Sequence, residues 1–335
     1  MMAGFTGWAL WREPGEAQAW ALHGPVMPQT GNIQAAGYWV QPFEAQAPLV
    51  IQGQPQSCPP DSRLPADWPL HPGPVFHAID KDTYLARLQA LVDALKAGAA
   101  KKVVICRKAT LPRQPFSMEE ATAAFWRLCR AYPKAFCSLV SIPTLGTWVA
   151  ATPETLCRQV GTTFETMSLA GTRALADSTP WLAKEYREQD LVTGAIIAQL
   201  DLLGAQDLNV AGPQTVQAGA VAHLQTKISF TGEFSLQQVA SALHPTPAVG
   251  GLPLEAALRL MHGFEGGHRG LYAGYVGYLP AQKADASLYV HLRCACLTAG
   301  QPTLFAGGGI LPESDPLAEW QETEAKLQVL MPYLS

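Results

Sequence analysis

The 335-residue sequence has no concentration of charge of one sign. It holds 23 Lys and Arg against 27 Asp and Glu, for a net charge of −4 at pH 7, and the basic residues are dispersed along the chain. Binding to a phosphate backbone or to an anionic membrane surface requires clustered cations. We therefore expect neither nucleic acid nor a membrane as a partner.

The sequence also lacks a secretion signal and a membrane span. Arg12 and Glu13 interrupt the early apolar residues before an apolar signal core can form. The stretch 17–43 carries no formal charge, but its Gly, Pro, Gln and Asn residues would be costly in a bilayer. We expect a cytoplasmic protein.

The cysteine pattern suits neither a disulfide framework nor a zinc site. The seven cysteines are odd in number and include no CxxC pair. Scattered thiols of this kind are typical of a reducing compartment. We expect them to be buried as small core hydrophobes, without a redox or metal role.

Loops for nucleotide phosphates are absent as well, since neither GxGxxG nor GxxxxGK[ST] follows an expected strand. Glycines are found instead at 170–172 (AGT) and 307–309 (GGG), at the ends of two expected strands. Such positions let backbone N–H groups approach an anionic ligand, although a bulge or a tight bend is the ordinary alternative. A small anionic ligand is favoured over ATP or NAD.

The chain divides at a proline-rich segment. Seven prolines lie between residues 53 and 74, where they exclude a helix and a central strand. We expect residues 1–76 to form an N-terminal segment with this connection, with short strands at 38–40 and 49–51, as part of the same fold. Residues 77–335 are expected to form the catalytic domain.

Periodic patterns in this second part predict an α+β fold with large antiparallel sheets covered by helices. Apolar residues at helical spacing, a capping box of Ser117 with Glu120, and an N-cap at Asp315 predict helices. They are expected at 84–95, 118–128, 183–203 and after Asp315, with two short ones flanking 244–253. Short connections between the expected strands indicate antiparallel pairing. These strands are 103–106, 135–142, 147–151, 155–160, 166–169, 228–232, 271–279, 288–297 and 304–310.

Glutamates lie in line with apolar residues on two expected helices. Glu188 precedes the apolar stripe of helix 183–203, and Glu319, Glu322 and Lys326 follow one face of the last helix. The ordinary interpretation is an exposed Glu322–Lys326 pair, which stabilises a helix by about 0.2–0.5 kcal/mol. If both helices direct glutamates to a shared point, the set suits Mg²⁺, which takes one or two carboxylates with waters and substrate oxygens.

Two further residues have the chemistry of an acid and a base. Lys102 opens the strand 103–106 and alternates with the small apolar Val104 and Cys106, which suggests an inward face. Burial favours the neutral amine, which can act as a base. Glu154 follows Pro153 between two strands. A solvated strand end and a turn in water are the alternatives for these two residues.

Taken together, the segments resemble the chorismate-utilising enzymes over roughly residues 84–335, in that family's order. Any one segment could match by chance, but the ordered set is specific. The matching segments are Lys102-Val103-Val104, ATPETL (151–156), LAGTR (169–173), Glu188 within KEYREQDLV, HLQT (223–226), HPTPAVGGLP (244–253), YAGYVGY (272–278), Arg293 within HLRCA, FAGGGI (305–310) and EWQETEAK (319–326).

The resemblance implies the fold of anthranilate synthase component I and a site for chorismate. It implies that Glu188 and Glu322 hold Mg²⁺, which binds the ring carboxylate, with Glu319 near the metal. Arg293 would pair with the enolpyruvyl carboxylate. The remaining implied substrate contacts are backbone at Gly171 and Gly307, Lys326, His223 and Ala248.

The same resemblance implies the reaction of an isochorismate synthase. Lys102 would take a proton from the water that attacks ring carbon C2, and Glu154 would protonate the C4 hydroxyl as it leaves. The apolar Ala248-Val249 pair matches the isochorismate synthases, whereas the amine-transferring relatives usually have Gly-Thr or Gly-Ser there. Salicylate, anthranilate and aminodeoxychorismate synthases, and an inactive chorismate-binding homologue, remain as alternatives.

The resemblance implies further expectations about context. We expect a monomer whose product feeds menaquinone, siderophore or salicylate biosynthesis, with menaquinone weighed first. The family often has AGAG where residues 306–309 read AGGG. Since both versions are small, the pocket shape is little affected. Residues before about 84 give no match to the family and are short.

Overall fold

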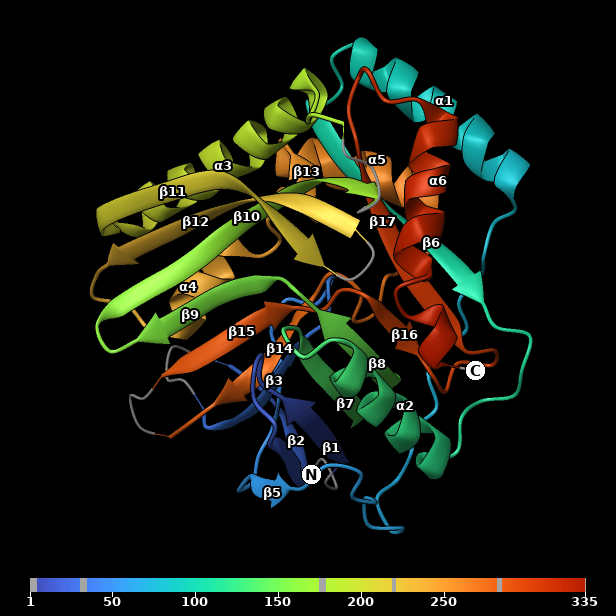
Figure 1. Ribbon diagram of the computed structural model, residues 1–335, viewed down its shortest axis with the longest axis vertical. Helices are drawn as coiled ribbons and strands as arrows, with labels where there is room; N and C mark the ends of the chain where they lie inside the picture. The colour runs from blue at the N-terminus through green and yellow to red at the C-terminus, as the bar shows by residue number, and fades with distance from the viewer. Residues whose placement is uncertain (1–4, 31–34, 175–178, 219–220, 282–284, 335) are drawn as a thin grey trace.

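The computed structural model describes residues 5–30, 35–174, 179–218, 221–281 and 285–334, whose strands form two antiparallel sheets that share β2 (Figure 1). The first sheet has the order β13 (Gly251–Leu252), β6 (Lys102–Thr110), β17 (Thr303–Ile310), β16 (Cys294–Cys296), β8 (Gly146–Thr152), β7 (Phe136–Ile142), β1 (Thr6–Arg12), β2 (Ala19–Pro28) and β5 (Gln56–Cys58). The second has the order β11 (Gln206–Ala218), β12 (Val221–Thr231), β10 (Thr163–Ala174), β9 (Thr155–Val160), β15 (Ala286–Val290), β14 (Tyr275–Leu279), β3 (Gly37–Gln41), β4 (Leu49–Ile51) and β2.

Helices cover these sheets. In Figure 1, α3 runs along β10, β11 and β12, and α2 lies in front of β7 and β8. The helices α1, α5 and α6 gather around β6 and β17. Their bounds are α1 (Lys81–Lys96), α2 (Met118–Ala131), α3 (Ala183–Leu203), α4 (Leu236–Leu243), α5 (Leu254–Glu265), α6 (Pro316–Leu327) and the 3₁₀ turn η1 (Met331–Tyr333). The predicted α+β class, with antiparallel sheets covered by helices, is confirmed.

Local signals in the sequence set several of these boundaries. Ser117 and Glu120 form both hydrogen bonds of the capping box at the start of α2. Asp315 caps α6 by accepting from the Ala318 N–H, with Pro316 in the first turn. Capping is readable from sequence because its partners lie within three residues of each other.

Several strand predictions were wrong in extent. Those at 103–106, 166–169 and 228–232 were too short, since β6, β10 and β12 are longer, and two others were too long. The strand expected at 271–279 begins only at Tyr275, after a turn. The strand expected at 288–297 is two strands in different sheets, because the backbone of Arg293 is left-handed, with φ of 47°. A side chain with a Cβ rarely adopts this conformation, so sequence periodicity gives no sign of the break.

Several strands were not predicted at all. β1 is one of them, and it pairs with β7, so the N-terminal segment contributes to the first sheet. The strand expected at 38–40 is present as β3, which pairs with β14 in the second sheet. β11 carries the cis peptide Gly212-Pro213 and mostly exposed side chains. It therefore lacks the alternation of apolar and polar residues on which a prediction depends.

Two clusters of buried apolar side chains form the core. The larger one includes Trp39, Tyr84, Trp148 and Phe164, and the smaller one lies between α2 and the β1–β7–β8 part of the first sheet. All seven cysteines are buried and unpaired by disulfides, as expected of core thiols. Across the described residues, the search for a helix long and apolar enough to cross a membrane finds none.

Candidate active site

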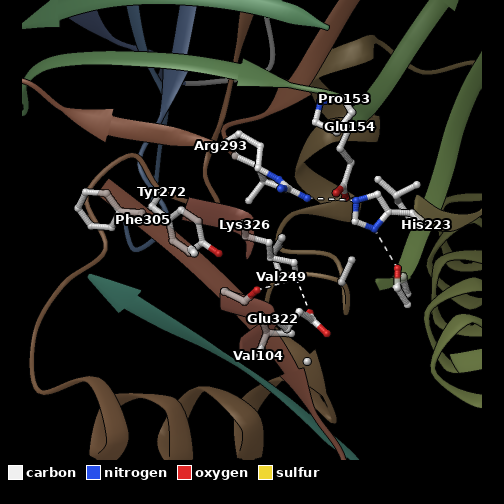
Figure 2. A pocket seen from close by; sticks show the side chains of 18 of the residues that line it. Val104, Pro153, Glu154, His223, Val249, Tyr272, Arg293, Phe305, Glu322 and Lys326 are labelled. Carbon is white, nitrogen blue, oxygen red and sulfur yellow. Dashed lines mark hydrogen bonds and ion pairs between the residues drawn. The ribbon is translucent and has the colours of Figure 1, made fainter. Parts of the chain in front are cut away.

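A cavity with an empty volume of about 660 Å³, counting its open mouth, lies where β6, β17, α3 and α6 meet the loops after β8 and before β16 (Figure 2). Most of the site residues predicted from sequence line this cavity. They are Glu154, Gly171, Glu188, His223, Ala248, Arg293, Gly307, Glu322 and Lys326. Segments as far apart as residues 154 and 326 therefore contribute to one site.

The remaining two predicted residues lie behind the cavity wall. Lys102 is 1% exposed and its Nζ lies 2.9 Å from Glu188 Oε1, so it reaches the site through that carboxylate. Glu319 is also buried, where Lys184 Nζ at 2.8 Å and Ser314 Oγ at 2.7 Å donate to its Oε1. The inward face predicted for Lys102 is confirmed.

Glu154 is buried and the Glu188 side chain is 13% exposed, and their pKa values are shifted in opposite directions. Burial raises the pKa of Glu154 to about 7, against weaker opposing effects of Lys102 and Arg293. Burial acts in the same sense on Glu188, but the charges of Lys102, Lys326 and Lys184 outweigh it and lower its pKa. At neutral pH Glu154 thus holds a proton about half of the time, whereas Glu188 is ionised.

Arg293 and His223 form a hydrogen-bonded pair on one side of the cavity, next to Glu154 (Figure 2). Arg293 Nη2 lies 3.1 Å from His223 Nε2, and His223 Nδ1 lies 2.9 Å from the Gly171 carbonyl oxygen. Because a guanidinium only donates, Nε2 must accept and Nδ1 must carry the proton. Burial and the charge of Arg293 lower the pKa of His223 to about 3, so the ring is neutral.

The Arg293 guanidinium retains an unused donor. Its Nη1 is buried and has no hydrogen-bond partner among the described residues, while the side chain as a whole lines the cavity. A buried donor without an acceptor is costly, and a ligand carboxylate would satisfy it through a charge-assisted hydrogen bond. The left-handed backbone at this residue carries a strain cost of about 1–3 kcal/mol.

Lys326 and Glu322 lie on the other side of the cavity in Figure 2. Lys326 Nζ lies 2.6 Å from Glu322 Oε1 and donates to the Gly307 carbonyl oxygen at 2.8 Å. The side chains are 14% and 26% exposed, respectively. The interpretation as an ordinary solvated helix pair is therefore wrong, because both residues line the cavity.

The glycines of β17 make room for side chains. A Cβ at Gly307 would overlap the Tyr272 hydroxyl, and one at Gly309 would overlap Glu188 Oε1 and approach Lys102 Cε at 2.8 Å. Gly171 has φ of 66° at a bulge of β10, and its carbonyl accepts from His223. The absence of side chains at 307 and 309 thus permits the Tyr272 and Lys102–Glu188 contacts.

Sequence reasoning missed an aromatic wall of the cavity. Tyr272 and Phe305 line it and stack with ring centroids 5.7 Å apart. With Val104, Val249 and Leu292 they provide the apolar surface that a carbon ring would contact. Tyr272 begins the YAGYVGY motif, so the signal was present, but no chemistry had been attached to it.

The residues present suit a divalent metal by their chemistry. Glu188 and Glu322 line the same cavity and come from α3 and α6, and Mg²⁺ takes one or two carboxylates with waters and substrate oxygens. In the described part of the chain, no three His, Cys, Asp or Glu side chains are grouped as a ready ligand set. The two carboxylates instead contact Lys102 and Lys326.

The fold and this cavity define a chorismate-binding enzyme, and the family comparison agrees. The family model described as "Chorismate binding enzyme" matches residues 72–335, so the chain belongs to that family. The chain is 34% identical over 324 residues to a Mycobacterium tuberculosis protein provisionally named isochorismate synthase MenF, covering 87% of this chain and 84% of that one.

Two further relatives extend the comparison. The isochorismate synthase EntC of Escherichia coli K12 is 30% identical over 269 residues, which cover 76% of this chain and 68% of EntC. The solved structure of MenF, the menaquinone-specific isochorismate synthase of Escherichia coli, superposes with a TM-score of 0.76 at 22% identity, covering 98% of this chain and 89% of that chain. The match to the solved MenF structure shows that the two chains share a fold.

Proposed function

We propose that this chain is an isochorismate synthase, a Mg²⁺-dependent isomerase that interconverts chorismate and isochorismate. The observation that carries the proposal is a buried carboxyl group with a pKa of about 7 at the cavity, together with a buried lysine that contacts the cavity through Glu188. A carboxyl group with this pKa can supply a proton at neutral pH, and a lysine in its neutral form can remove one. The names of the relatives, isochorismate synthases, support the same activity.

The unused Nη1 of Arg293 and the remaining hydrogen-bonding capacity of Lys326 give two cationic contacts for a dicarboxylate. Tyr272 and Phe305 supply a flat apolar wall for its ring. Glu188 and Glu322 would hold Mg²⁺, which supplies charge neutralisation and orientation of a substrate carboxylate. A divalent cation and a dicarboxylate bring equal and opposite charge to the cavity.

The proposed reaction needs no redox partner. In the proposed step, Lys102 in its neutral form takes a proton from water while the water oxygen forms a bond to ring carbon C2. The ring double bonds shift, the C4–O bond breaks, and Glu154 gives its proton to the leaving hydroxyl, which departs as water. Water is therefore both consumed and released, and each proton-transfer group contributes about 10²–10⁴-fold in rate.

Water rather than ammonia is the proposed nucleophile. Ala248 and Val249 line the cavity with apolar side chains, so this wall offers no hydroxyl to bind a second small molecule. Incubation with chorismate and Mg²⁺, with and without ammonium, followed by chromatography, should give isochorismate in both cases. Salicylate or an aminated product would show a different enzyme of the family, and binding without turnover would show an inactive homologue.

The base assignment has a matched control in the neighbouring residue. Lys102→Ala should lower turnover by about 10²–10⁴-fold because the proton acceptor is lost. Lys101→Ala should leave it unchanged, since Lys101 is exposed and precedes the strand. Full turnover by Lys102→Ala would refute the assignment.

The metal requirement has a separate test. Chelation with EDTA should abolish activity, and added Mg²⁺ should restore it.

A further inference from the structure

A buried ion pair lies behind the cavity at the end of α5. Arg269 Nη2 lies 2.6 Å from Glu265 Oε1, and the two side chains are 0% and 2% exposed. Neither belongs to the described residues that line the cavity. Removing two charges from water is costly, so a pair in this position requires further contacts to be maintained.

Those contacts are backbone groups of two cavity walls. Arg269 Nη2 donates to the Val104 carbonyl at 2.7 Å, and Nη1 donates to the Val249 carbonyl at 2.8 Å. Val104 and Val249 both line the cavity. Val104 is two residues from Lys102 on β6, and Val249 is in the loop that follows α4. One guanidinium thus joins the strand of the proposed base to the wall that faces the proposed nucleophile.

The ion pair continues an interrupted sheet edge. β13 pairs with β6 only at Gly251–Val103 and Leu252–Lys102. Beyond that point, Arg269 takes the Val104 carbonyl and Glu265 Oε1 accepts from the Cys106 N–H at 2.8 Å. Alternate residues of a strand direct their backbone groups to the same edge. The two side chains therefore replace the hydrogen bonds of a neighbouring strand where β13 ends.

We propose that Arg269, held by Glu265, is a positioning residue that fixes the Lys102 strand and the Ala248–Val249 loop at their working separation. The inference rests on the proposed function for its kinetic consequence. A lysine could keep the ion pair with Glu265, but its single nitrogen on a flexible stem cannot replace a planar fork that holds two carbonyls and a carboxylate. The planar shape of the Arg269 guanidinium, more than its charge, maintains the separation between the Lys102 strand and the Ala248–Val249 loop.

Two variants separate the fork from the charge. Arg269→Lys keeps the positive charge and removes the double carbonyl contact, so kcat should fall by about 10–100-fold, because a displacement of about 1 Å can cost 10²-fold. KM should change by less than about threefold, since the implied substrate contacts of Arg293 and Lys326 are untouched. Glu265→Gln keeps the two carbonyl acceptors of Arg269 but leaves the buried guanidinium without its counter-charge, so the unfolding temperature should fall and kcat should fall less than in Arg269→Lys.

A destabilised variant elsewhere provides the control. Leu10→Ala removes a fully buried side chain of β1 in the smaller core cluster, so it should lower the unfolding temperature and leave kcat unchanged. Hydrogen–deuterium exchange should accelerate at 102–106 and 245–250 in Arg269→Lys and not in Leu10→Ala. If Arg269→Lys does not fold, the double variant Arg269→Gln with Glu265→Gln, which buries no charge, replaces it with the same expectations.

The outcomes separate this proposal from the proposed function. If wild type turns over chorismate and Arg269→Lys keeps kcat within twofold, or loses no more than Leu10→Ala, positioning by Arg269 is refuted. If wild type forms no isochorismate, the proposed function fails, and the exchange data alone decide. Unchanged exchange at both segments in Arg269→Lys would then refute the positioning role.

Discussion

Adding a methyl group at either of two adjacent glycines of β17 should have different effects on kcat. In Gly309→Ala, the new Cβ overlaps Glu188 Oε1 and lies 2.8 Å from Lys102 Cε, so one of these buried groups must move. In Gly308→Ala, the nearest atom to the new Cβ is Glu319 Oε2 at 3.4 Å, an ordinary contact. Gly309→Ala therefore displaces the Lys102–Glu188 pair, whereas Gly308→Ala leaves that pair in place.

The size of the effect follows from what each methyl group meets. Overpacking of a dense interior costs about 1–3 kcal/mol in stability. Displacement of a reacting group by about 1 Å can cost about 10²-fold in rate. We expect kcat of Gly309→Ala to fall about 100-fold. We expect the kcat of Gly308→Ala to stay within about threefold of wild type, because the 3.4 Å contact of its Cβ with Glu319 requires no rearrangement.

The assay is the initial rate of isochorismate formation at saturating chorismate and Mg²⁺, with thermal unfolding of both variants measured in parallel. Gly309→Ala should remain folded at the assay temperature, so that the loss lies in kcat. Equal rates for the two variants would refute the reasoning, since they would show that the space at Gly309 is not required by the Lys102–Glu188 pair. A lower rate for Gly308→Ala than for Gly309→Ala would refute it too.

Three other predictions concern individual groups. With the pKa of Glu154 raised to about 7, its proton is lost as pH rises through 7, so kcat/KM for chorismate should decline on that side, and Glu154→Gln should lose about 10²–10⁴-fold with no decline there. Arg293→Lys should weaken chorismate binding by about 10–150-fold, the equivalent of one charge-assisted hydrogen bond of about 1.5–3 kcal/mol, and unchanged binding would contradict the carboxylate contact. The pKa of His223 is lowered to about 3, so nitrogen NMR should show a neutral Nδ1–H ring at pH 5, and a protonated ring there would contradict the assignment.

Local chemistry in the sequence predicted much of the fold. The caps at Ser117 and Asp315 and the bounds of α3 depend on residues close in sequence, and they were confirmed. The break at Arg293 depends instead on which sheets the two halves join, β9 in one and β8 in the other. Pairing over such distances has no local signature, so the continuous apolar run predicts a single strand.

The sequence predicted which residues form the candidate site but not how they are arranged. Most of the eleven predicted residues line one cavity, and they could be predicted because each belongs to a recognisable motif. The exposure of Glu322 and Lys326 could not be predicted, because it depends on the packing of α6 beside β17. From sequence alone they resemble an exposed helix pair. The role of the glycines at 307 and 309 was likewise hidden, since it depends on side chains from residues 102, 188 and 272.

Two carboxyl groups at the same cavity, Glu154 and Glu188, have different electrostatic environments. Lys102 contacts Glu188 at 2.9 Å, whereas no cation within the described residues lies at ion-pair distance from Glu154. Burial therefore dominates at Glu154 and raises its pKa, while the lysine charges dominate at Glu188 and lower its pKa. Divergent environments of this kind separate a proton donor from a permanently charged group. Glu154 is consequently the carboxyl group suited to protonate a leaving hydroxyl, and Glu188 is suited to bind a cation.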